Sequence, residues 1–304
     1  MINGNPKPAS SMETSLERNW KRFSAFYRRF ARNRGSLVGL GMLLTIFILG
    51  WGIPLITRVD ALKMVGEAFQ PPSGTYLFGT DDVGRNVFHQ VVVGAQTSVM
   101  VGLTAAAVST VIGLIVGSVS GHYGRWLDAF LMRATELFMV IPRGFLALVM
   151  VAIMGASIWN IIFAIGVLSW PSTARLVRSE FLKFKHSEFV DAARASGAPE
   201  RRIMVYEILP NAFPTIIVNT ALEVGSAILL EAGISFLGLG DPQQMSWGVM
   251  LYQAQIFMRR APWMTIFPGV GIFLTVMGLN LFADGLNEAL NPKFRRIIKL
   301  KAEE

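Results

Sequence analysis

Three carboxylic side chains, Glu136, Glu223 and Glu231, stand inside long apolar stretches of the chain. An ionisable group in such a stretch is costly unless it faces a cavity or a charged partner. Glu136 follows Arg133 by three residues, so the two can pair on one helix face, or Glu136 can line a transport path. Glu223 and Glu231 are eight residues apart, near one helix face. They can meet an amino terminus or a metal cation on such a path, or pair with a second membrane subunit.

Other kinds of site chemistry find no support in the sequence. It has no cysteine, and its three histidines are scattered, so neither a thiolate site nor a local metal cluster is expected. It contains no H-E-x-x-H pattern and no phosphate-binding G-x-x-x-x-G-K-[ST] loop. We therefore expect no catalytic residue, no metal or other cofactor, and no ATPase site in this chain.

The elements that must position these carboxylates are predicted to be membrane-spanning helices. The chain is 52% hydrophobic and 16% charged, with a mean hydropathy of +0.47, whereas soluble domains carry about a quarter charged residues. A spanning helix needs about 20 mostly apolar residues. Six segments qualify: 36–56, 95–121, 127–154, 158–174, 212–239 and 264–286. The predicted fold class is an all-α membrane protein with six transmembrane helices. Pro142 and Pro171 are expected to bend the third and fourth spans, the fourth ending near Pro171.

The distribution of basic residues predicts an orientation. The net charge is +8, and most lysines and arginines precede the first span, follow the fourth, or follow the sixth. By the positive-inside rule these parts, and both termini, are cytoplasmic. Because the basic residues flank apolar segments, they suit a lipid bilayer, and no nucleic-acid partner is expected. The predicted domains are a basic N-terminal tail (1–35), a membrane domain (36–290) and a C-terminal tail (291–304).

A stripe of small residues marks the second span. Ser109, Gly113, Gly117 and Gly121 recur at every fourth position and so share one helix face. Small residues let two helix backbones approach closely. The sequence favours tight packing inside this chain, with contact to a second membrane subunit as the alternative.

The loop 186–211 is predicted to fold into two short helices outside the membrane. Ser187 is expected to cap the first helix and Gly197 to end it with a positive φ. Pro199 suits the first turn of the second helix, and Leu209-Pro210 is expected to stop that helix before the fifth span. Such a structured loop is a docking surface by shape. The alternative is an amphipathic helix lying on the membrane.

The same loop resembles the EAA motif of importer permeases of the ATP-binding-cassette superfamily. In that motif, three residues separate Glu-Ala-Ala from a glycine. Nine further residues then precede an isoleucine, and one more residue precedes a Leu-Pro pair. Asp191, Ala192, Ala193 and Gly197 keep the spacing, as do Leu209 and Pro210. Two positions depart from it: Asp191 replaces glutamate, and Glu207 stands where the motif has isoleucine.

Further stretches resemble the dipeptide, oligopeptide and nickel branch of these permeases. They are 78–87 (FGTDDVGRNV), 94–98 (GAQTS), 234–240 (ISFLGLG), 246–248 (SWG), 280–286 (within NLFADGL) and 291–293 (NPK). The resemblance covers about residues 20–295. The long basic N-terminus and short C-terminal tail are similar to the C-type member of a two-permease pair.

The resemblance implies a multi-pass inner-membrane subunit of a binding-protein-dependent, ATP-driven importer of dipeptides or oligopeptides. Its implied partners are a second permease, two ATPase subunits that bind the ATP and magnesium, and an extracytoplasmic solute-binding protein. The implied coupling residues are Asp191, Ala192, Ala193, Gly197, Leu209 and Pro210. The same machinery importing nickel, glutathione or another small solute stays open. Remoter alternatives are a stand-alone channel or secondary transporter, and a polytopic membrane enzyme.

Overall fold

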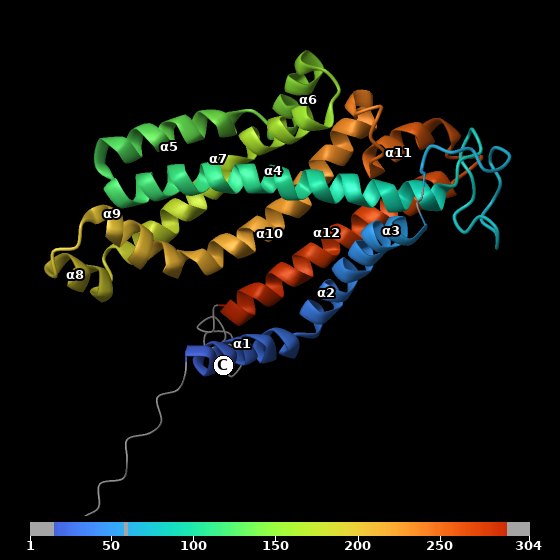
Figure 1. The fold of residues 1–304 in the computed structure, drawn as a ribbon. Coiled ribbons are helices and arrows are strands. Elements are labelled where there is room, and N and C mark those ends of the chain that lie inside the picture. The colour runs from blue at the N-terminus through green and yellow to red at the C-terminus, as the bar shows by residue number, and fades with distance from the viewer. Residues whose placement is uncertain (1–14, 58–59, 291–304) are drawn as a thin grey trace, which may run out of the picture.

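A computed structural model describes residues 15–57 and 60–290 of the chain (Figure 1). In these two ranges every regular element is a helix, apart from isolated β-bridges that join Met64 to Arg85 and Thr80 to Asn86. The predicted C-terminal tail and residues 1–14 of the predicted N-terminal tail lie outside the described residues. The rest of that N-terminal tail contains a helix that the hydropathy pattern did not predict.

The helices follow one another along the chain with short connections, except for the long loop 60–86. In chain order they are α1 (Ser15–Arg32), α2 (Arg34–Phe47), η1 (Ile48–Gly52), α3 (Ile53–Thr57), α4 (Val87–Tyr123), α5 (Arg125–Val140), α6 (Arg143–Met154), α7 (Ile158–Lys185), α8 (Glu188–Ala195), α9 (Glu200–Arg202), η2 (Ile203–Ile208), α10 (Leu209–Ile234), η3 (Ser235–Leu239), α11 (Trp247–Ala254), η4 (Gln255–Phe257) and α12 (Trp263–Leu290).

Within residues 15–57 and 60–290, five helical stretches are long and apolar enough to cross a membrane. They are Arg34–Thr57, Val87–Tyr123, Ile158–Lys185, Glu200–Leu239 and Trp263–Leu290. A sixth span is present if the bent pair α5 and α6 is counted as one. The prediction of an all-α membrane protein is therefore confirmed, and the third predicted span is the broken one.

The break in the third span lies at Pro142. Helices α5 and α6 differ in direction by 79°, and Ile141 and Pro142 between them adopt extended backbone angles. Proline cannot donate a backbone hydrogen bond, and it restricts the residue before it to extended conformations. The predicted bend is thus confirmed as a sharp elbow (Figure 1).

The prediction that the fourth span ends near Pro171 is wrong. Helix α7 continues through Pro171 to Lys185, so the fourth span does not end there. A buried helix tolerates an interior proline when neighbouring helices hold the backbone in place. Here Thr173 and Ala174, just after the proline, pack against Gly113 of α4.

The helical path also continues through Pro210. Pro210 lies in the first turn of α10, which continues from η2 without a break. The prediction that Leu209-Pro210 stops the second loop helix is therefore wrong. The π-helical turn Ile203–Ile208 inserts an extra residue before Pro210, and the first helical turn is the place where a missing N–H costs least.

The small-residue stripe of α4 packs against α7. A Cβ atom added to Gly117 would lie 2.4 Å from the Ala174 carbonyl oxygen, and one added to Gly121 would lie 2.7 Å from Cβ of Phe181. Ser109 is fully buried. The predicted tight packing inside the chain is confirmed, and α4 and α7 form the central pair of the bundle (Figure 1). The second span also begins at Val87, earlier than predicted.

The two ends of the bundle carry different non-spanning parts. Helices α8 and α9 lie at one end, whereas α11 and the loop 60–86 lie at the other (Figure 1). At the second end Asp81 accepts hydrogen bonds from the backbone of Val83 and Arg85 and from the Gln90 side chain. Trp263 donates its indole N–H to the Thr80 carbonyl, so the loop 60–86 is fastened to both α4 and α12.

Candidate functional site

The loop between α7 and α10 forms a compact helix pair, as predicted, and Gly197 makes the turn between its halves. Gly197 has a φ of +78°. Its N–H donates to the Arg194 carbonyl, and the next N–H, of Ala198, donates to the Ala193 carbonyl. These two bonds define a Schellman motif, in which glycine is the preferred residue because the left-handed conformation strains any side chain with a Cβ. The predicted helix-ending role of Gly197 is confirmed.

Ser187 holds the predicted position just before α8 but not the predicted contact. Its hydroxyl donates to the Phe184 carbonyl behind it, and α8 has no side-chain cap. A serine hydroxyl can bond backward to a carbonyl of the preceding turn as well as forward to a free N–H. Here the backward bond secures the end of α7 instead.

The inner face of the helix pair is anchored to the bundle by apolar packing. Val190 of α8 and Ile203 and Ile208 of η2 are fully buried against Val177 and Phe181 of α7. Burying such side chains stabilises the loop by about 1.5–3 kcal/mol each. The loop is therefore a rigid extension of the spans, and this packing differs from that of an amphipathic helix resting on lipid.

The outer face carries most of the predicted coupling residues. Asp191, Ala192, Gly197 and Pro210 are exposed, whereas Ala193 and Leu209 are partly buried against the apolar cluster beneath the loop. Around Gly197 a Cβ atom would meet nothing within 4 Å. The motif residues thus divide into an outward group, which is open to a partner, and an inward pair, which fastens the loop.

A chain of polar contacts crosses the loop and reaches α4. Arg194 lies 3.4 Å from Asp191 and 3.1 Å from Glu200, and its Nη1 also donates to the Lys185 carbonyl. Glu200 in turn lies 2.8 Å from Nε2 of the buried His122. The sequence reasoning missed Arg194, Glu200 and His122. The spacing of Asp191 and Arg194 was a visible signal, but the approach of His122 depends on tertiary structure.

The three membrane carboxylates have separate environments. Glu136 pairs with Arg133 at 3.3 Å on the exposed face of α5. Glu223 pairs with Arg143 of α6 at 3.0 Å. Glu231 accepts hydrogen bonds from Ser235 and Ser246 at 2.7 Å each and lies 3.5 Å from the Ser98 hydroxyl. Of the two alternatives for Glu136, the ion pair with Arg133 is present, and Glu223 and Glu231 contact different neighbours.

The Arg143–Glu223 pair lies beside a hollow at the elbow between α5 and α6. The hollow has a volume of about 390 Å³. Its lining is mixed and comprises Phe138, Met139, Ile141, Pro142, Arg143, Leu168, Ser169, Pro171, Ser172 and Glu223. Arg143 was visible in the sequence as a charge in the third span, but the sequence reasoning gave it no role.

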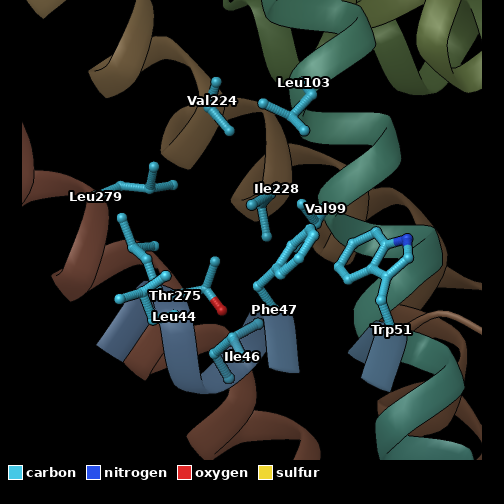
Figure 2. Close-up of a pocket in the computed structure, with 11 residues that line it drawn as sticks. Leu44, Ile46, Phe47, Trp51, Val99, Leu103, Val224, Ile228, Thr275 and Leu279 are labelled. Atoms are coloured by element: carbon cyan, nitrogen blue, oxygen red, sulfur yellow. The ribbon is translucent and has the colours of Figure 1, made fainter. Parts of the chain in front are cut away.

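A second hollow, of about 280 Å³, lies between α2, α4, α10 and α12 (Figure 2). Its lining is apolar except for Thr275, whose hydroxyl already donates to the Gly271 carbonyl. In Figure 2 the rings of Phe47 and Trp51 lie on the α2 side of this space. The lining offers no charged side chain to a charged solute, so the two hollows differ in the chemistry that they can support.

Comparison with known proteins decides the family. Residues 109–296, more than half of the chain, match the family described as binding-protein-dependent transport system inner membrane component. The chain belongs to this family. The matched region starts within α4 and includes the elbow, the loop with Gly197 and α12.

Named relatives resemble this permease over most of its length. A dipeptide transport system permease protein of Alkalihalophilus pseudofirmus is 38% identical over 271 residues, which cover 88% of this chain and 89% of the relative. An oligopeptide permease protein of Bacillus subtilis is 33% identical over 95% of this chain and 97% of its own length. A glutathione permease protein of Pectobacterium atrosepticum is 35% identical over 93% and 94%. The predicted family resemblance is therefore confirmed, and the permease is a multi-pass component of an inner membrane.

Proposed function

We propose that this permease forms the transmembrane path of an ATP-driven importer of dipeptides and oligopeptides. It works with a second permease, two ATPase subunits and an extracytoplasmic binding protein. Both termini and the loop 186–211 face the cytoplasm, where the ATPases are. ATP and magnesium bind to those subunits, and this chain supplies the path and the mechanical connection.

The observation that carries this proposal is the construction of the loop between α7 and α10. Its inner face is fixed to the spans by Val190, Ile203 and Ile208, while its outer face presents Asp191 and Ala192 next to the open turn at Gly197. A partner that moves this surface moves the attached helices, because packed interiors transmit displacement rather than absorb it. A stand-alone channel has no use for such a surface.

The basic residues support the proposed orientation. Arg194, Arg201 and Arg202 lie in the loop, and Lys183 and Lys185 lie in the last turns of α7. The opposite end of the bundle carries α11 and the loop 60–86 (Figure 1), which have fewer basic residues. The positive-inside rule then places the loop end in the cytoplasm and the α11 end on the side where a binding protein docks.

The proposed substrate class follows from the relatives. Relatives that carry dipeptide or oligopeptide in their names match the chain at 33–38% identity over most of its length. A glutathione permease matches at a similar level, and glutathione is itself a short peptide. Peptide import is thus the proposal, and other small solutes are outcomes that the test separates.

The test is to tag this chain, extract it gently from its native membrane, and identify the proteins that purify with it. We expect an ATPase and a second permease of similar size. The complex, placed in liposomes with its binding protein, should accumulate radiolabelled trialanine only when ATP is present. Isolation of the chain alone in a stable form would contradict the proposal, and accumulation of only a non-peptide solute would contradict the substrate class.

A further inference from the structure

Arg143 has hydrogen-bond donors to spare at a depth where charge is costly. It opens α6 directly after the Pro142 break, and only its Nη1 bonds to Glu223, which lies near the middle of α10. A guanidinium carries five N–H donors. The Arg143 side chain is 42% exposed, whereas that of Glu223 is 10% exposed. Because lipid does not solvate a guanidinium, the open side of Arg143 must face a water-filled path or a polar partner.

The hollow beside Arg143 also holds an unsatisfied polar group. Ser169 lines it, the residue is 2% exposed, and its Oγ is buried with no hydrogen-bond partner among the described residues. A buried hydroxyl without a partner costs about 1–3 kcal/mol. Such a group in a cavity is expected to be satisfied by water or by a ligand. The hollow therefore combines a partly exposed cation with a buried hydroxyl in its wall that has no partner among the described residues.

The arrangement favours a carboxylate as the ligand. Glu223 accepts a hydrogen bond from Nη1 of Arg143. The Nε and Nη2 atoms of the same guanidinium make no bond to Glu223. Two parallel N–H groups of arginine match the two oxygens of a carboxylate. With Glu223 in place, the pair is electrically neutral before binding, and the carboxylate gains a charge-assisted contact in a medium that screens little.

We propose that Arg143, positioned by Glu223 and assisted by the Ser169 hydroxyl, binds the free carboxylate of a peptide passing through the membrane. This site deepens the proposed function and rests on it. The hollow in Figure 2 does not suit the same purpose, because its lining holds no charged side chain and its polar groups are the bonded Thr275 hydroxyl and the Trp51 indole. Apolar lining residues of the elbow hollow, such as Phe138 and Leu168, would contact the rest of the peptide.

The experiment uses the complete importer in liposomes with its binding protein, and it measures ATP-driven uptake of radiolabelled trialanine. Four versions are compared with the wild type: Arg143→Gln, Arg143→Lys, the exchange Arg143→Glu with Glu223→Arg, and the control Lys183→Gln. Lys183 also loses a positive charge and an ion pair at 3.0 Å, with Glu180, but it lies away from the hollow.

We expect Arg143→Gln to lower uptake about tenfold or more, the effect of losing a charge-assisted hydrogen bond. Arg143→Lys should raise the trialanine concentration at half-maximal uptake (the half-saturation concentration). Lysine keeps the positive charge but lacks the two parallel N–H donors that match a carboxylate. The exchange keeps an ion pair but moves the cation to the less exposed position, so uptake should stay low. Lys183→Gln should stay within about twofold of the wild type.

Two results would overturn the carboxylate site: uptake by Arg143→Gln equal to that of the control, or full recovery in the exchange, which would make the pair structural only. If the Arg143→Gln chain fails to assemble with its partners, the Arg143→Lys variant provides the test. A half-saturation concentration equal to that of the wild type would then contradict the site. A wild-type complex that imports no trialanine would instead contradict the proposed function, and the site with it. Normal wild-type uptake with no effect at Arg143 would contradict the site alone.

Discussion

The Nε2 atom of His122, one residue before the end of α4, lies 2.8 Å from Oε2 of Glu200, the first residue of α9. The His122 side chain is buried and that of Glu200 is half-exposed. Glu200 also accepts a hydrogen bond from Arg194, which contacts Asp191 in the motif. One carboxylate thus joins both halves of the loop helix pair to the end of α4.

Replacing Glu200 by alanine is expected to weaken ATP-driven uptake about fivefold or more while the chain still inserts into the membrane. The change removes one of three acceptors of Arg194, beside Asp191 and the Lys185 carbonyl. It also removes the carboxylate that lies 2.8 Å from Nε2 of the buried His122, and losing a charged hydrogen-bond partner costs about 1–3 kcal/mol. The measurement is uptake per amount of chain in the membrane. Glu188→Ala, on the exposed first turn of α8, is the matched control. Equal uptake by the two variants would contradict the role of Glu200.

Substitutions at Gly197 separate backbone strain from the shape of the outer surface. At a φ of +78° a residue with a Cβ is strained by about 1–2 kcal/mol, and asparagine tolerates this conformation best. Among the described residues no neighbour lies within 4 Å of a Cβ there, so an added methyl group causes no clash with them and a larger side chain extends the outer surface. We expect Gly197→Leu to abolish coupled uptake with insertion intact, Gly197→Ala to reduce it, and Gly197→Asn to be milder than leucine.

The readout for this series is uptake together with recovery of the ATPase on the tagged chain. Loss of ATPase recovery that increases with side-chain size indicates a docking surface. If alanine and leucine behave alike and asparagine behaves like the wild type, only the backbone turn matters. Wild-type uptake by Gly197→Leu would contradict a coupling role for this residue.

A single added methyl group should destabilise the α4–α7 contact. Gly117→Ala places a Cβ 2.4 Å from the Ala174 carbonyl oxygen, so the helices must separate, at a cost of about 1–3 kcal/mol. Gly269→Ala in α12 is the control, because nothing lies within 4 Å of its Cβ, and alanine there is expected to favour the helix by about 0.5–1 kcal/mol. Thermal unfolding in detergent should place the first variant below the wild type and the second at or above it.

Two substitutions of Glu231 distinguish structure from transport. Glu231→Gln keeps an oxygen that accepts from Ser235 and Ser246, so we expect near-normal stability. Glu231→Leu leaves those hydroxyls without an acceptor and should cost about 1–3 kcal/mol per group. The measurement is thermal stability beside uptake. Lost uptake in a stable Glu231→Gln protein would show that the charge itself serves transport, as its place in the fifth span suggested.

Local rules in the sequence were enough for the elements whose cause is local. The apolar runs predicted the spans because each needs only its own length and composition. Gly197 was predictable because a Schellman turn requires one residue type at one position. The stripe from Ser109 to Gly121 predicted close packing since four residues of one helix share a face.

The failures have a common cause in the surrounding structure. Pro171 and Pro210 were predicted to end helices, but packing against Gly113 holds α7 together, and the π-helical turn of η2 places Pro210 where no N–H is needed. The links from Arg143 to Glu223 and from His122 to Glu200 join residues about 80 positions apart. No period or motif along the chain encodes them.

Helix α4 has 37 residues and so is about 55 Å long, whereas the hydrocarbon core of a bilayer is about 30 Å thick. It therefore extends beyond the hydrocarbon core. The loop 60–86 contacts α4 near its first residues, and Glu200 contacts it near its last. Along its small-residue stripe, Thr173, Val177 and Phe181 of α7 fit against Gly113, Gly117 and Gly121. Side chains seated in such notches resist both separation and sliding, because close-packed interiors transmit displacement. The pair is thus suited to move as one rigid unit when it is pushed at either face of the membrane.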